Sequence, residues 1–309
     1  MMSRRKNRIS RTREDIIFDT VNTFFLLCVL FLTLYPFYHV LILSLNEGLD
    51  AARGGIYFWP RKWSLENFQS LLGDPKWAKS LLISVSRTLI GTVGTVGFTA
   101  LVAYGMSFKE LVFRKWYYAV IILAMYFHGG MIPTFALYRS IKILNTFWVY
   151  VAPALLNTFF MMVMISFFQD IPISLIEVAR LDGASEITIF RKIILPLSLP
   201  ILATTALFVG VGQWNSWIDS AYYVSSKELR TMSYLMMEII NKSMIDRLGS
   251  GAAAGIEVSQ QTLANSSTAV TTRSIQMAAM IVSVAPIICV YPFLQKYFVK
   301  GIMLGSVKG

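Results

Sequence analysis

EVARLDGASEITIFRKIILP, residues 177–196, is a polar stretch set between long apolar runs. Residues 173–182 favour a short helix, and Gly183 stands where helices commonly end in the left-handed conformation. Ser185 can cap a second short helix that runs through Lys192. The stretch therefore predicts two short helices joined by a turn at Gly183.

These two helices carry more apolar side chains than a solvated connecting loop needs. Apolar groups that water would otherwise surround are normally covered by another surface. We therefore expect the segment to lie against a partner protein or a membrane. The residues concerned are Val178, Leu181, Ile187, Ile189, Phe190, Ile193 and Ile194.

The composition of the whole chain is that of an integral membrane protein. Of its 309 residues 55% are hydrophobic and only 15% are charged, with a mean hydropathy of +0.58. A bilayer core of roughly 30 Å needs about 20 apolar residues for each helical span. The sequence predicts an all-α protein with six transmembrane helices, at residues 24–45, 80–108, 116–137, 147–168, 199–218 and 275–298.

The distribution of Lys and Arg predicts the orientation, because short loops rich in these residues stay in the cytoplasm. It places both termini inside, and the net charge of +11 then reflects topology rather than nucleic-acid binding. The domains expected are an N-terminal tail (1–23), a six-helix transmembrane domain (24–298) with a cytoplasmic loop (169–198) and an external loop (221–273), and a C-terminal tail (299–309). The end of the external loop is either a flexible linker or a segment that a partner orders.

The second apolar run has small residues at four-residue spacing. Such rows let helix backbones approach closely within lipid, where van der Waals packing holds helices together. We therefore expect this helix at the centre of the bundle. One row is Ser80, Ser84, Thr88 and Thr92, and the next is Gly91, Thr95, Thr99 and Ala103.

Motifs for independent catalysis are missing from the sequence. It has no phosphate-binding loop of the G-x-x-x-x-G-K-[ST] type and no His or Cys pattern with metal-ligand spacing. Cys28 and Cys289 fall inside predicted spans, where apolar packing is the simpler role. We therefore expect the chain to bind no cofactor and to hydrolyse no ATP by itself.

A few polar residues in the predicted spans are candidates for a substrate path. Arg87 lies within the second span, where a charge is costly; the alternatives are a structural pair or a side chain that reaches the interface. His128 is either a pore contact or a packing residue. The GQWNSW segment offers amides and flat apolar rings that suit sugars, or else it is an interfacial aromatic belt. Its candidate residues are Gln213, Trp214, Asn215 and Trp217.

The quoted stretch resembles the signature of permease subunits of bacterial ABC importers. That signature reads E-x-A-x-x-x-G, then nine residues, then I-x-L-P, and the one departure is Val178, where the family more often has Ala. The matching residues are Glu177, Ala179, Gly183, Ile193, Leu195 and Pro196.

The likeness extends along most of the chain. The segments SRTLIGT, GGMIPT, LNTFWVYVAPALLNTFFMMVMISFFQDIP, GQWNSW and YFVKGIMLGSVKG are similar to carbohydrate importers of the MalG type, in the branch that contains LplC and YtcP. The resemblance implies a type I importer permease (MetI-like) fold in the bacterial plasma (inner) membrane. It also implies that residues 177–196 form the coupling helix, which docks on an ATPase.

The partners that this resemblance implies are a second, homologous permease in a heterodimer, two ATP-binding subunits that hold ATP and Mg²⁺, and an external solute-binding protein. Residues 249–255 would enter that protein's sugar cleft, and residues 305–309 would reach toward the ATPase. The cargo expected is a sugar or oligosaccharide, and acidic ones such as alginate or pectin fragments would suit Arg87. The alternatives are a permease for a non-sugar solute, an intramembrane enzyme and a passive membrane scaffold.

Overall fold

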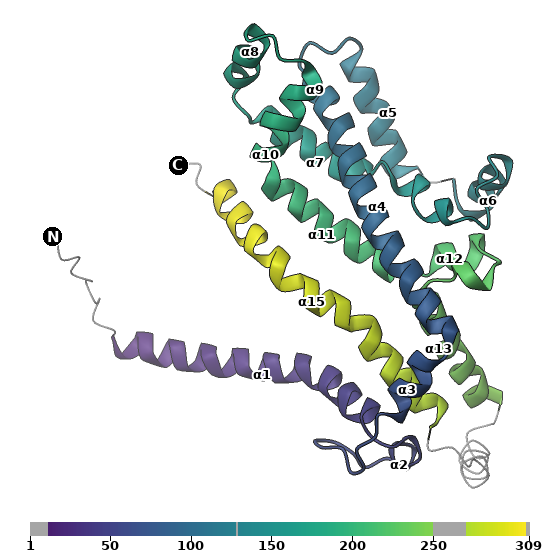
Figure 1. The fold of residues 1–309 in the computed structure, drawn as a ribbon. Helices are drawn as coiled ribbons and strands as arrows, with labels where there is room; N and C mark the ends of the chain where they lie inside the picture. Colours follow the sequence, from purple (N-terminus) through teal and green to yellow (C-terminus); the bar gives the residue numbers. More distant parts are fainter. Residues whose placement is uncertain (1–11, 128, 250–269, 307–309) are drawn as a thin grey trace. The chain divides into compact units, whose positions relative to one another are not determined.

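The computed structural model describes residues 12–127, 129–249 and 270–306, and within these ranges the chain is helical and holds no β-strand (Figure 1). An isolated antiparallel bridge joins Asn46 to Trp63. The all-α prediction is confirmed. The chain divides into two compact units, of which the first comprises Met1–Gln69 and Gln261–Ile281 and the second Ser70–Gln260 and Val282–Gly309.

The first unit contains helix α1 (Arg13–Ser44), helix α2 (Gly48–Ala52) and the loop that follows it. Thr12 caps α1, because its side chain accepts from the Asp15 amide while the Asp15 carboxylate accepts from the Thr12 amide. Most of α1 is apolar and exposed, as expected of a helix whose surroundings are lipid.

A buried polar cluster fixes the loop after α1. The Asn46 side chain donates to Asp50 at 3.0 Å and accepts from the Lys62 amide at 2.9 Å. Asn67 donates to the carbonyls of Ser44 (2.9 Å) and Asn46 (2.8 Å). Buried amides of this kind are stabilising only when they are paired, and here they tie the loop to the end of α1.

Helix α4 (Pro75–Ser107) forms the centre of the second unit. It begins at Pro75, whose missing N–H costs nothing in the first turn, and the Asp74 side chain caps it by accepting from the Lys76 amide at 2.9 Å. It packs along α7 (Thr158–Gln169) and α11 (Leu199–Asn215) (Figure 1).

The small residues of α4 are the reason that its neighbours approach so closely. A Cβ on Gly91 would lie 3.0 Å from the Gln213 side chain of α11, and one on Gly94 would lie 3.0 Å from Leu155. The predicted central position of this helix is confirmed, because the second row is buried at all four of its positions. The buried residues of the two rows are Ser80, Ser84, Gly91, Thr95, Thr99 and Ala103.

Helices of several lengths make up the rest of the described chain outside residues 173–197. They are α3 (Glu66–Gly73), α5 (Arg114–Tyr126), α6 (Met131–Ser140), η1 (Phe147–Tyr150), η2 (Ala152–Ala154), α12 (Ile218–Tyr223), η4 (Lys227–Leu229), α13 (Met232–Gly249) and α15 (Thr272–Ser306). Helix α3 and helix α15 each contribute residues to both units.

Each predicted span falls on a helix or a broken pair of helices. Two helices of the described ranges, α1 and α4, are long and apolar enough to cross a membrane unbroken, and three bent pairs raise the number to as many as five. The fourth predicted span bends by 43° between η2 and α7. Pro153 and the capping residue Asn157, which accepts from the Phe160 amide at 3.1 Å, account for this bend. The sixth corresponds to α15, whose apolar described part, Arg273–Cys289, is shorter than a full span.

Candidate coupling segment and substrate cleft

The stretch 177–196 forms the helix-turn-helix that its residues predict. Helix α8 (Ile173–Leu181) is followed by the C-cap Asp182 and then by Gly183, which has φ +79°. The Gly183 amide donates to Arg180 O and the Ala184 amide to Ala179 O, both at 3.0 Å, which is the paired bonding of a Schellman cap. The turn is therefore a specified structure that depends on glycine.

The second half of the segment is a continuous helix with a change of winding. Ser185 caps α9 (Glu186–Ile189), since its side chain accepts from the Thr188 amide at 3.4 Å. A π-helical stretch, η3 (Phe190–Ile194), follows, and then a last turn, α10 (Leu195–Leu197). The predicted cap at Ser185 is confirmed, whereas the predicted end near Lys192 is too early.

The apolar side chains of this segment divide between two faces. Ile189, Phe190 and Ile194 are buried in one cluster with residues of α4 and α7, among them Ala100 and Met161. On the opposite face the side chains are exposed, and Leu181 is 87% accessible. One face thus anchors the segment to the helical core, and the other leaves an apolar patch made of Ile173, Leu175, Val178, Leu181 and Ile187.

The six signature residues follow the same division. Ala179, Ile193 and Leu195 are half-buried against the core cluster. Glu177, Gly183 and Pro196 are exposed. The carboxylate of Glu177 is therefore available to an external group, as a role in docking requires.

Glu186 connects the turn to helix α4. One of its carboxylate oxygens accepts from Arg180 Nε at 2.7 Å, and the other accepts from the Tyr104 hydroxyl at 2.7 Å. The Arg180 guanidinium lies 5.3 Å from the ring centroid of Phe108. The Tyr104 ring contacts Phe108 and Phe190, at centroid distances of 4.9 and 5.2 Å.

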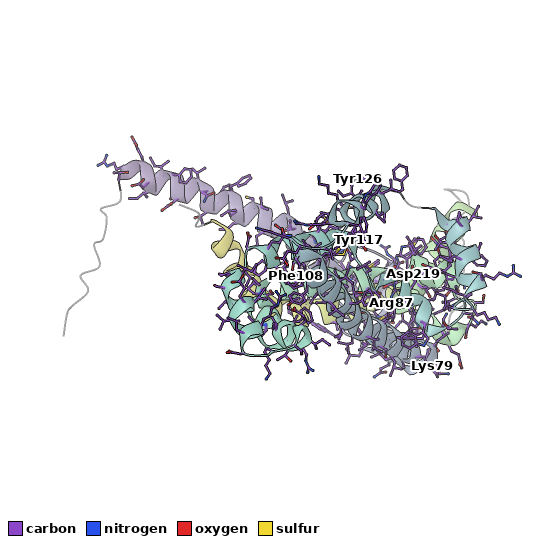
Figure 2. All side chains as sticks on the ribbon, turned by 90° about the horizontal axis from the view of Figure 1, so that it is seen from above. Lys79, Arg87, Phe108, Tyr117, Tyr126 and Asp219 are labelled. Atoms are coloured by element: carbon purple, nitrogen blue, oxygen red, sulfur yellow. The ribbon has the colours of Figure 1, made fainter. Side chains whose placement is uncertain are left out.

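A second polar cluster surrounds Arg87 in the first half of α4, and Figure 2 labels Arg87 and its partner Asp219. The Arg87 side chain is 3% exposed and forms an ion pair with Asp219, whose side chain is 32% exposed. Arg87 Nε donates to Gln213 Oε1 at 2.8 Å, and Nη1 donates to the Ser216 carbonyl at 3.0 Å, just beyond the end of α11. A buried cation is stabilised only with such partners.

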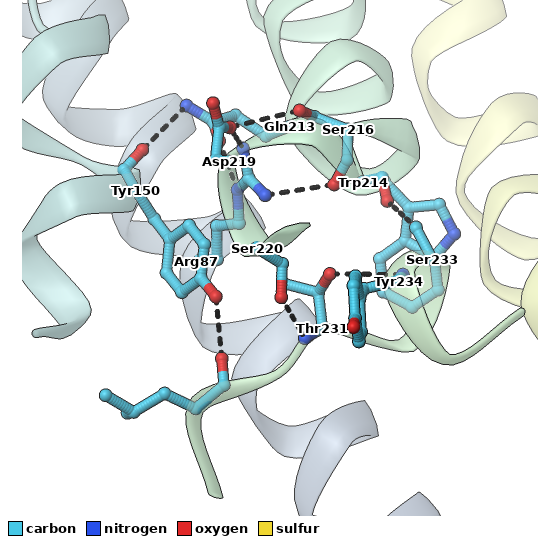
Figure 3. Close-up of polar contacts among 11 residues, drawn as sticks. Arg87, Tyr150, Gln213, Trp214, Ser216, Asp219, Ser220, Thr231, Ser233 and Tyr234 are labelled. Atoms are coloured by element: carbon cyan, nitrogen blue, oxygen red, sulfur yellow. Dashed lines mark hydrogen bonds and ion pairs between the residues drawn. The ribbon is translucent and has the colours of Figure 1, made fainter. Parts of the chain in front are cut away.

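Tyr150 covers the remaining side of the guanidinium (Figure 3). Its ring centroid lies 4.6 Å from the Arg87 Cζ atom, and its hydroxyl donates to the Leu229 carbonyl at 2.7 Å. The Ser216 hydroxyl donates to Asp219 at 3.0 Å and so fixes the carboxylate. Four elements of the second unit, α4, η1, α11 and α12, therefore meet around one charged group, and η4 holds the Tyr150 hydroxyl.

An open cleft of about 410 Å³ lies beside this cluster within the second unit. Aromatic rings and a few hydrogen-bonding groups line it, and this combination suits the C–H faces and hydroxyls of a sugar. The polar and aromatic residues are Arg87, Thr95, Tyr138, Tyr150, Asn157, Phe160, Phe208, Gln213 and Asp219.

The structure brings together two of the predicted path residues, Arg87 and Gln213, and both line the cleft. Trp214 is buried on another side of α11, where its indole N–H donates to the Ser283 carbonyl at 2.9 Å. Asn215 is exposed and Trp217 half-buried, and neither lines the cleft. His128 and residues 250–255 lie outside the described residues, as do the last three residues of the chain.

Asp219 and Tyr150 are members of the cluster that the sequence pattern did not reveal. Asp219 follows an apolar run directly and looks like the start of a loop. The only signal for it was indirect, because a buried Arg needs an anionic partner somewhere in the chain.

Comparison with known proteins agrees with this architecture. Residues 96–304 match the family model described as binding-protein-dependent transport system inner membrane component. The chain is 34% identical to the polygalacturonan/rhamnogalacturonan transport system permease protein YtcP of Bacillus subtilis (strain 168), over 98% of this chain and 100% of that protein. It is 31% identical to the protein LplC of the same organism, over 96% of this chain and 97% of the other.

A solved structure shares the fold. It is the crystal structure of a bacterial ABC transporter involved in the import of the acidic polysaccharide alginate, and one of its chains is similar with a TM-score of 0.81 and 26% sequence identity. The match covers 94% of this chain and 99% of that chain.

Proposed function

The chain belongs to the family of binding-protein-dependent transport system inner membrane components, and we propose that it is the membrane subunit of an ATP-driven importer of acidic oligosaccharides. The observation that carries the proposal is the two-faced segment 173–197. Its inner face is anchored in the core, while its outer face offers an apolar patch and the free Glu177 carboxylate to another protein.

The partner of that outer face is an ATPase subunit. Glu177 would pair with a basic group of the ATPase, and Leu181 and Ile187 would fill an apolar groove beside it. The partner ATPases hold ATP and Mg²⁺ and perform the hydrolysis. A second permease and an external solute-binding protein complete the importer, with six spans in each permease and both termini in the cytoplasm.

The cleft beside Arg87 forms part of the sugar path. The rings of Tyr138, Phe160 and Phe208 would contact the C–H faces of a sugar, and the amides of Asn157 and Gln213 its hydroxyls. The names of the relatives favour acidic sugars, since one transports polygalacturonan and another belongs to an importer of alginate. Uronic acid oligomers are therefore the proposed cargo.

Uptake by the reconstituted complex tests this proposal. We expect proteoliposomes that contain both permeases and both ATPases, with the loaded binding protein outside, to accumulate a galacturonate trimer when ATP is inside. A neutral arabinose trimer is the matched control and should accumulate far less. Equal accumulation of the two trimers, or none that depends on ATP, would contradict the proposal.

Gly183→Val tests the coupling role of the segment. A Cβ at Gly183 meets no atom within 4 Å, so the change acts through backbone strain of roughly 1–2 kcal/mol at φ +79°. We expect ATP-dependent uptake to fall by about tenfold, the change in rate to which about 1.4 kcal/mol corresponds, while ATP hydrolysis continues and insertion into the membrane is unchanged. Gly54→Val is the control, because Gly54 also has a positive φ (+77°) and open space but lies in the first unit. Wild-type uptake by Gly183→Val would refute the coupling role.

A further inference from the structure

Three side chains form a polar brace between the coupling segment and the transmembrane helix α4. They are Tyr104 of α4, Arg180 of α8 and Glu186 of α9, with Glu186 in the middle accepting from the other two at 2.7 Å each. We propose that Tyr104 and Glu186 are positioning residues, which make α4 move as one body with the coupling segment. This inference rests on the proposed function, because it concerns a movement that ATP hydrolysis drives.

The brace closes the turn at Gly183. The Arg180–Glu186 ion pair spans that turn, so α8 cannot swing away from α9 without breaking a charge-assisted hydrogen bond. Both side chains are about half exposed, and water therefore weakens this pair. By itself the ion pair would hold α8 against α9 only weakly.

Tyr104 connects this ion pair to the helical core. Its side chain is buried in the last turn of α4, and its hydroxyl donates to the Glu186 oxygen that Arg180 leaves free. Its ring is held between those of Phe108 and Phe190. Because a ring in such packing has little freedom, a displacement of Glu186 pulls on the backbone of α4 rather than on a flexible side chain.

Helix α4 connects the brace to the cleft. Tyr104 and Arg87 lie on the same helix, roughly 25 Å apart at 1.5 Å of rise per residue. A shift of the coupling segment that moves α4 therefore reaches the partners of Arg87 on α11 and α12. Apolar packing alone could let the two surfaces slide, whereas the brace fixes one contact between them.

Distance measurements between spin labels test the brace in the assembled complex. The nitroxides are attached to cysteines that replace Lys109, just after α4, and Lys192 of η3, whose side chains are both exposed. The native Cys28 and Cys289 are changed to Ala. In the wild type we expect the same distance without nucleotide and after trapping with ADP and vanadate.

The variants Tyr104→Phe and Glu186→Gln weaken the brace while they keep the size of each side chain. We expect each to shift or broaden the trapped-state distance by more than about 2 Å, the scale of helix shifts in coupled proteins. Tyr104→Phe removes only the bond to α4, whereas Glu186→Gln also removes the charge that pairs with Arg180, so its effect should be at least as large. Tyr117→Phe, at an exposed tyrosine of α5, is the matched control and should behave as the wild type.

Two results would overturn the inference. One is a wild-type distance that changes on trapping, since α4 and the segment would then move apart. The other is a pair of variants that keep the wild-type distance in both states. A complex that hydrolyses no ATP would instead contradict the proposed function. ATP hydrolysis is measured before the distances are compared, so the two failures are distinguished.

Discussion

At the scale of single residues, Arg87 shows how this protein keeps a charge inside an apolar bundle. Its guanidinium uses Gln213, the Ser216 carbonyl and Asp219 as acceptors and lies against the Tyr150 ring. The cation is already neutralised by Asp219. An acidic sugar in the cleft would therefore meet an ion pair rather than a free positive charge.

Asp219→Asn should be strongly destabilising, because it leaves Arg87 buried without its counter-charge. Breaking a buried pair costs about 3–5 kcal/mol, and the partial exposure of Asp219 places this case near the lower figure. The double variant Arg87→Met/Asp219→Asn should recover part of the loss. Thermal unfolding of the purified complex measures both.

The exposed pair Lys79–Glu228 is the control for that experiment. Lys79→Met should change the free energy of unfolding by less than about 1 kcal/mol, as surface pairs do.

Additive effects of the Arg87 and Asp219 changes on the free energy of unfolding would show that the two residues do not interact.

Asp50 predicts a dependence on pH in the first unit. The hydrogen bond from the Asn46 side chain, and then the nearby Arg61 charge, hold the pKa of the Asp50 carboxyl below its usual value. A lowered pKa stabilises the fold above the unfolded value of about 3.9 and loses this effect as pH falls through the folded value. We expect the protection of amides in residues 46–62, relative to their intrinsic exchange rate at each pH, to fall below about pH 4, and Asp50→Asn to abolish that fall. An equal loss of protection in the variant would contradict this.

At the scale of elements, the small residues of α4 determine how near α11 can come. Gly91→Val should displace the Gln213 side chain, because even a Cβ there would lie 3.0 Å from its amide. Overpacking of this kind costs roughly 1–3 kcal/mol. Thermal unfolding should show the loss. Gly97→Val is the matched control on the same helix, since a Cβ at Gly97 meets nothing within 4 Å. Equal losses in both variants would mean that helix propensity rather than packing decides the result.

Local signals in the sequence predicted these elements well. The four-residue spacing of Ser, Thr and Gly is enough to identify the central face of α4, and Gly183 with Ser185 is enough to place the turn. The fourth span was predicted to be straight because the length of its apolar run suggested one helix. Pro153 and Asn157, which end one helix and cap the next, are the signals for the bend.

At the scale of the whole molecule, prediction from sequence stopped where distant segments meet. Arg87 was a candidate from its position alone, but no local pattern links it to Asp219 or Tyr150, which other helices supply. The aromatic lining of the cleft was likewise hidden among many apolar residues. The class of assembly, by contrast, is indicated by the local signature at residues 177–196, and similarity along the whole chain confirms it.

The π-helical stretch η3 affects the direction in which the exposed side chains of the signature segment point. A π turn holds one residue more than an α-helical path between the same ends, and each residue of a helix turns the chain by about 100°. The nine residues between Gly183 and Ile193 include part of this wider turn. The number of residues between Gly183 and Ile193 therefore sets the orientation of the patch around Leu181, about the helix axis, relative to Ile193. With one residue fewer, the patch would point about a quarter of a turn away from its present direction. The same side chains would then face a different neighbouring surface.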